Sequence, residues 1–168
     1  GVNEDGPSAA VNAINHTRME FVPAEQGRYG YVMWGYDMSR NQLGMNDQGL
    51  YWDWLAAPEH TIDATGTRMW LASTLDELLW SCATVDEAIG YVRNIAWTSP
   101  MAGQMFLADR HGDSAIWEGN IIIRPEADAD FFIGTNFLQS DPSAGNYPCW
   151  RYDTLTTMLS DGFELTRD

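Results

Sequence analysis

Strand-like segments fall into two groups along this sequence, and a pair of short amphipathic helices separates the groups. The segments that alternate or are rich in aromatic residues are 17–22, 29–34 and 49–56 before the helices, and 104–108, 114–118, 121–124 and 130–135 after them. A further helix is expected over 150–160. Strand groups separated by helices favour an α+β fold of packed layers, and 168 residues fit a single domain.

The central helices are predicted from two capping boxes, in which a Thr is followed three residues later by a Glu, at 74–77 and 84–87. One face of the second helix carries Val85, Ala88, Ile89 and Val92. We therefore expect both helices to pack on another layer and to have a structural role.

Two turns are predicted between strands. Asn46, Asp47 and Gly49 give turn chemistry within residues 43–49, and residues 109–113 have the composition of a hairpin turn. The 109–113 turn joins two of the predicted strands directly, so these two strands are expected to be antiparallel neighbours.

The charge balance is strongly acidic. The formal net charge is −15, and all nine basic residues are Arg. Phosphates and anionic lipid surfaces would be repelled, so no nucleic-acid or membrane partner is expected. A solubilising acidic surface explains the charge more simply than an acidic partner does.

Familiar catalytic and metal motifs are absent from the sequence. The two cysteines, Cys82 and Cys149, are far apart and lack a nearby His at ligand spacing, so two buried thiols are expected rather than a disulfide or a metal site. His16, His60 and His111 are scattered, and none has an evident catalytic partner.

Three polar residues are candidates for a site. Asn136 follows the apolar run 130–135, where its amide could donate to a developing oxyanion or simply bond its own loop. Arg151 lies at the start of the last predicted helix, where the helix dipole does not favour a cation. It therefore either anchors a carboxylate or packs on Trp150. Asp5 lies in a loop-like opening segment.

Taken in order, several segments resemble the N-terminal-nucleophile amide hydrolases, the group of choloylglycine hydrolases, penicillin V acylases and related acyltransferases. The resembling segments are GVNEDG at 1–6, LGMNDQGLYWDWLAAP at 43–58, LLWSCATVDEAIGYV at 78–92, MFLADRHGDSAIWEG at 105–119, GTNF at 134–137 and YPCWRYDTL at 147–155. Each is weak alone, and their common order gives the resemblance its specificity.

The resemblance implies a four-layer α-β-β-α sandwich and an N-terminal Cys that attacks an amide with its own α-amine as base. It implies that Asp5 holds that amine, that Asn136 contributes to the oxyanion hole, and that Arg151 orders the site electrostatically. Such a Cys would lie one strand before Gly1, so residues 1–168 are expected to be a partial domain, cut at both ends and inactive alone.

The function expected from this resemblance is hydrolysis of a small-molecule linear C–N amide, without a metal or organic cofactor. Acyl transfer by the same fold is an alternative. A further alternative is a non-catalytic binding protein, because eight Trp are many for this length. The compartment, and association with further copies of the chain, stay open.

Overall fold

The computed structural model describes residues 17–36, 40–62, 66–69, 71, 73–97 and 100–162. The elements in chain order are β1 (Thr17–Val22), β2 (Tyr31–Tyr36), β3 (Arg40–Asn46), β4 (Tyr51–His60), β5 (Arg68–Met69), α1 (Thr74–Ser81), α2 (Val85–Arg93), β6 (Ile95–Ala96), β7 (Met101–Ala108), β8 (Ser114–Glu118), β9 (Ile121–Ile123), a 3-10 turn (Pro142–Ala144) and α3 (Trp150–Ser160). No helix among these residues has the length and apolar character needed to cross a membrane.

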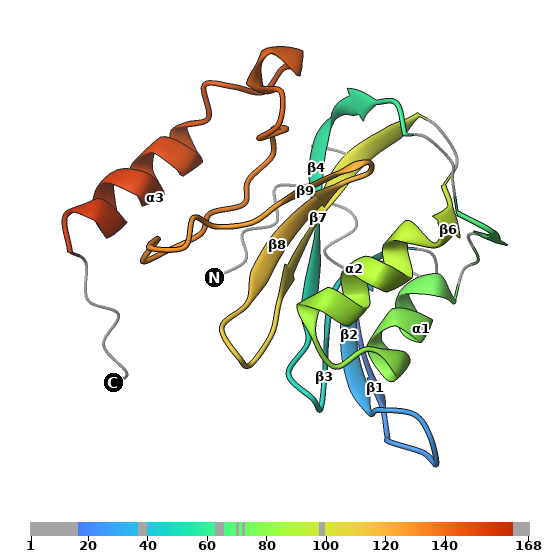
Figure 1. Cartoon of the computed structure of the whole chain (residues 1–168). Coiled ribbons are helices and arrows are strands. Elements are labelled where there is room, and N and C mark those ends of the chain that lie inside the picture. Colours follow the sequence, from blue (N-terminus) through green and yellow to red (C-terminus); the bar gives the residue numbers. More distant parts are fainter. Residues whose placement is uncertain are drawn as a thin grey trace.

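Seven of the strands form one antiparallel sheet in the order β1-β2-β3-β4-β7-β8-β9, and α1 and α2 lie on one face of it (Figure 1). β5 and β6 pair separately and run parallel. The predicted α+β class is therefore confirmed. The described residues form one seven-stranded sheet with a helical layer and a separate two-stranded pair, so the four-layer sandwich stays a proposal.

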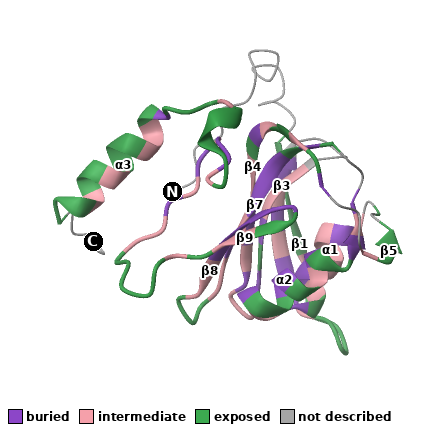
Figure 2. Ribbon diagram, turned by 45° about the horizontal axis from the view of Figure 1, so that its top comes forward, coloured by how far each residue is buried: buried purple, intermediate pink, exposed green. Residues whose placement is uncertain are grey.

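The core lies between the sheet and the two helices, where buried residues concentrate (Figure 2). One row of mutually paired residues crosses this face of the sheet: Met33, Gly44, Trp52, Leu107 and Ala115. Gly44 allows α1 to approach, because a Cβ at this position would lie 2.6 Å from the Leu79 side chain. The predicted apolar face of α2 is buried in the same core.

The two capping predictions have different outcomes. Thr84 caps α2 and accepts from the Glu87 amide at 3.3 Å, while the Glu87 carboxylate accepts from the Ala83 amide at 2.6 Å. At α1 the prediction was wrong, because the Thr74 hydroxyl accepts from the Leu71 amide instead. Thr74 is consequently the first residue of the helix rather than its cap.

Asn46 connects the β3–β4 turn to the end of α1. Its amide nitrogen donates to the carbonyls of Leu79 at 2.7 Å and Cys82 at 2.6 Å. Its amide oxygen accepts from the backbone N–H groups of Gln48 at 3.1 Å and Leu50 at 2.9 Å. The side chain therefore satisfies two carbonyls at a helix end, where intrahelical donors are lacking.

Most predicted strands are confirmed, and two corrections are needed. β3 (Arg40–Asn46) is a strand that the sequence did not predict, because the turn chemistry of Asn46, Asp47 and Gly49 predicted a turn over the overlapping residues 43–49. Residues 130–135, predicted as a strand, form none. The predicted 109–113 hairpin turn is confirmed and joins β7 to β8, with Gly112 at a φ of 87°.

Candidate functional site

Residues 131–138 cross the face of the sheet opposite α1 and α2. Phe106, the neighbour of core residue Leu107 on β7, points to this opposite face and contacts Phe132 at 5.8 Å between ring centroids. Gly134 lies so close that an added Cβ would be 2.8 Å from Phe106 and 2.9 Å from Leu55. Figures 1 and 2 both show this segment and α3 on the side of the sheet away from α1 and α2. We call residues 131–138 the crossing segment.

Side chains, rather than a strand ladder, hold the backbone of the crossing segment. The fully buried Gln104 donates from its amide nitrogen to the carbonyls of both Thr135 and Phe137, the latter at 3.0 Å. Asn146 donates to the carbonyl of Asn136 at 2.9 Å. Three consecutive carbonyls are thus satisfied by side-chain amides, which explains why a strand-like sequence forms no strand.

Glu118, at the end of β8, fixes the residues that follow the crossing segment. Its buried carboxylate accepts from the backbone N–H groups of Gln139 at 2.7 Å and Ser140 at 3.2 Å, and also from the Ser140 hydroxyl. Charged acceptors form stronger hydrogen bonds than neutral ones. The chain direction after Asn136 is therefore set by the sheet beneath it.

Asn136 is held by its backbone while its side chain stays partly exposed. No residue in the described part of the chain hydrogen-bonds its side-chain amide. The simpler interpretation, in which this amide bonds its own loop, is thus not what the described residues show. A side-chain amide that bonds no neighbour, on a backbone that is held in place, can present its N–H donors to a ligand.

Arg151 is the second residue of α3, as predicted, and its guanidinium carbon lies 5.9 Å from the centroid of the Trp150 ring. Phe137 joins α3 to the crossing segment through ring contacts with Tyr152 at 5.2 Å and Tyr147 at 4.9 Å. The immediate neighbours of Asn136 and Arg151 therefore touch. Asp5 lies outside the described residues, so convergence of all three stays a prediction.

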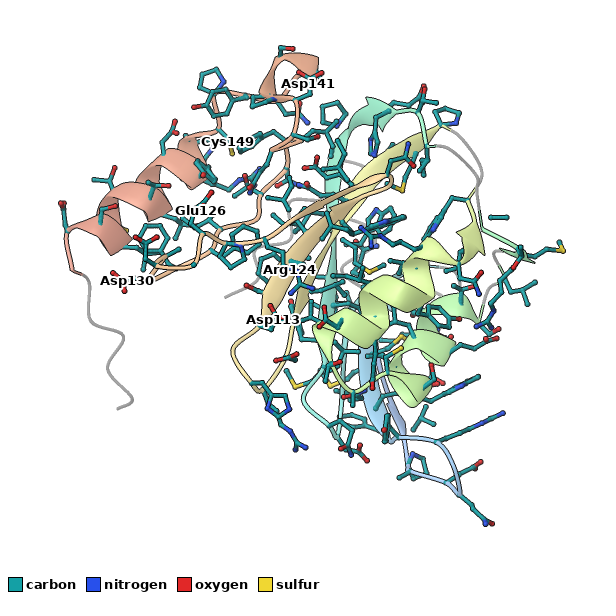
Figure 3. The ribbon with its side chains drawn as sticks, viewed as in Figure 1. Asp113, Arg124, Glu126, Asp130, Asp141 and Cys149 are labelled. Carbon is teal, nitrogen blue, oxygen red and sulfur yellow. The ribbon has the colours of Figure 1, made fainter. Side chains whose placement is uncertain are left out.

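Both cysteines are free and buried, as expected. Burial raises the pKa of the Cys82 thiol, which makes it a poorer thiolate nucleophile. Figure 3 shows Cys149 at the beginning of α3, away from Arg124 and Asp113, which face one another. Within the described ranges, no group of three or more His, Cys, Asp and Glu could hold a metal ion.

Arg124, the residue after β9, belongs to a surface ion-pair network. It donates to Asp113 at 2.5 and 2.6 Å and to Asp86 at 2.5 Å, and so joins β9 to the β7–β8 turn and to α2. A separate cavity of about 300 Å³ lies between the end of α2 and the turn after β8, with Arg93, Trp97 and Trp117 in its walls. Neither Asn136 nor Arg151 lines it.

Asp53 is a buried carboxyl group that the sequence pattern did not single out. It lies on β4, paired with Leu43 and Phe106, and accepts from the Tyr51 hydroxyl at 3.1 Å. Its other oxygen is buried with no hydrogen-bond partner among the described residues. Burial raises the pKa of Asp53, although bonds from the Tyr51 hydroxyl and the Trp54 backbone partly oppose this.

We expect Asp53→Asn to raise the free energy of unfolding at pH 7, because the neutral amide avoids the cost of keeping a buried carboxylate ionised. Because the folded pKa is raised, the stability linked to Asp53 is complete below its unfolded pKa of about 4 and is lost as pH rises through the folded pKa. Urea unfolding should show a higher free energy of unfolding for Asp53→Asn than for the unaltered protein at pH 7, and no such difference at pH 4. Asp130→Asn, at an exposed position, is the control; an equal gain for both variants would contradict the prediction.

Comparison with solved structures finds this fold in part of two longer chains. Two variants of conjugated bile acid hydrolase from Clostridium perfringens share the fold: one has 14% identity and a TM-score of 0.55 over 90% of this chain, the other 15% and 0.52 over 89%. Penicillin V acylase from Agrobacterium tumefaciens is 25% identical over 57% of this chain and 33% of its own, with a TM-score of 0.44.

The chain spans about half the length of the bile acid hydrolase chains, 52% and 51% of them. Comparisons with protein families and with curated proteins found no match. The predicted structural similarity to bile salt hydrolases is thus confirmed at the level of the fold.

Proposed function

We propose that this chain supplies about half of an amide hydrolase that cleaves linear C–N bonds through an N-terminal Cys. The observation that carries the proposal is the fold shared with conjugated bile acid hydrolase over 90% of the chain. The proposal is also supported by Asn136, whose backbone carbonyl accepts from Asn146 while its side-chain amide bonds no described residue. In this proposal the remaining layers of an α-β-β-α sandwich pack on the face of the sheet opposite α1 and α2, over the part that the crossing segment does not cover.

In the proposed reaction, the Cys thiol attacks the amide carbonyl, and the Cys α-amine accepts the thiol proton and returns it to the leaving amine. Neither Cys82 nor Cys149 can play this part, because an internal residue has no free α-amine. Water then hydrolyses the acyl-cysteine, or an acceptor amine takes the acyl group in the acyltransferase variant of the same chemistry.

Three residues have proposed roles. The Asn136 amide donates to the oxyanion that forms as the carbonyl is attacked. Arg151, joined to the same region by the Phe137–Tyr152 contact, stabilises developing negative charge. Asp5 orients the α-amine of the nucleophile.

The test is amide turnover by the protein expressed from its complete coding sequence. We expect release of amine from some of a panel of N-acyl amides, and inactivation by iodoacetamide. The Cys82→Ser/Cys149→Ser double variant should be just as active and just as sensitive to iodoacetamide, because both thiols are buried and uninvolved. If the double variant were no longer inactivated by iodoacetamide, the proposed mechanism would be contradicted. So would a folded protein that turns over no amide and forms no acyl adduct by intact mass. Product analysis with added amine separates hydrolysis from acyl transfer.

A further inference from the structure

We infer that Gln104 is a positioning residue for Asn136. The effect of this role on catalysis rests on the proposed function. Gln104 lies on β7, and its side chain points to the same face of the sheet as Phe106. Its amide nitrogen bonds the carbonyls on either side of Asn136, those of Thr135 and Phe137. One side chain thus holds the peptide group that precedes the proposed oxyanion donor and the peptide group that follows Phe137.

The geometry admits one orientation of the Gln104 amide. Both N–H donors are used by the two carbonyls, and the amide oxygen is buried without a hydrogen-bond partner among the described residues. A flipped amide would place its oxygen against two carbonyl oxygens, which repel it. The buried side chain is therefore a fixed donor pair, set in a rigid central strand of the sheet.

The crossing segment depends on this donor pair because it has no strand ladder. The remaining bond at this point comes from Asn146 to the Asn136 carbonyl, and Asn146 lies in an exposed loop. Gln104 is consequently the buried contact between the sheet and the backbone around Asn136. A displacement of about 1 Å in a site residue can lower a rate by about 100-fold.

The test compares Gln104→Met with Gln139→Met in the protein expressed from its complete coding sequence. Met is close in volume to Gln and cannot donate. Gln139 gives a matched control because its amide donates to the Ile133 carbonyl, in the same crossing segment but three residues before Asn136. A merely structural role predicts similar effects for the two variants.

We expect Gln104→Met to lower kcat about 10- to 100-fold per active site with KM nearly unchanged, because ground-state binding does not need the oxyanion donor. Gln139→Met should stay within about threefold of the unaltered protein. Backbone ¹⁵N heteronuclear NOE values at Asn136 and Phe137 should fall in Gln104→Met and hold in Gln139→Met.

Unchanged NOE values and kcat in Gln104→Met, or equal losses in both variants, would overturn the inference. The NMR readout does not depend on turnover. Lost order at Asn136 in Gln104→Met, together with an unaltered protein that hydrolyses no amide, would support the positioning and overturn the proposed hydrolase instead.

Discussion

Asn136→Ala is expected to lower kcat by about 10²- to 10³-fold, the effect of removing one oxyanion donor from an acyl-transfer site. The side chain is partly exposed and bonds no described residue, so its removal should leave the melting temperature within about 2 °C of the unaltered protein. Because the donor acts on charge that exists only after attack, KM should change little. The loss therefore belongs to the transition state and not to folding.

Steady-state kinetics on a chromogenic amide, with thermal unfolding of the same samples, test this expectation. Asn120→Ala is the control, since Asn120 is exposed on the turn after β8. It should keep kcat within about twofold. Asn136→Asp should lower kcat at least as much as Asn136→Ala does, because its carboxylate would repel the negatively charged oxyanion. A kcat of Asn136→Ala close to that of the unaltered protein would remove Asn136 from the mechanism.

Asn46→Ala is expected to lower the free energy of unfolding by about 3 kcal/mol or more. The substitution removes four hydrogen bonds at a buried position and leaves the Leu79 and Cys82 carbonyls without their side-chain donor. Leaving one buried polar group unsatisfied costs about 1–3 kcal/mol. The turn after β3 and the end of α1 should loosen together, because one side chain joins them.

Urea unfolding measures this loss, and Gln48→Ala provides the control. Gln48 is an amide residue on the same turn, and among the described residues its side chain bonds the exposed Asp47 carboxylate alone. Its removal should change the free energy of unfolding by no more than about 0.5 kcal/mol. A small loss for Asn46→Ala, similar to that for Gln48→Ala, would show that the turn and helix do not depend on this connection.

Local sequence signals predicted the elements that depend on neighbouring residues. The cap at Thr84 and the apolar face of α2 were readable from spacing, and β8 and α3 have the predicted bounds. The 109–113 hairpin was readable from turn composition. Each of these features is decided within about ten residues of chain, so the sequence pattern carries enough information.

The errors arose where a side-chain hydrogen bond outside the local pattern decides the structure. Residues 130–135 are apolar enough for a strand, but the carbonyls of residues 135–137 are bonded by Gln104 and Asn146 instead of a neighbouring strand. Thr74 fits a capping box, but its hydroxyl accepts a hydrogen bond from the backbone N–H of Leu71, in the loop before the helix. In each case a side-chain hydrogen bond replaced the local pattern.

The candidate site was predictable only in part. Asn136 and Arg151 were candidates from their positions after an apolar run and at the start of a helix, and the resemblance supplied their proposed roles. Gln104 and Asp53 were missed, because a polar residue in an alternating strand usually faces solvent. The Gln104 side chain is buried where the segment that crosses the opposite face of the sheet bonds it. A polar residue within the apolar run 104–108 was the only sequence signal for Gln104.

The most direct test of the account is the mature N-terminus of the protein produced from its complete coding sequence, measured by intact mass and N-terminal sequencing. The account predicts a mature chain that begins with Cys one strand before Asn3, with a free α-amine to act as base. A mature chain with no Cys, Ser or Thr at that position would contradict it, and would leave the shared fold without the proposed chemistry.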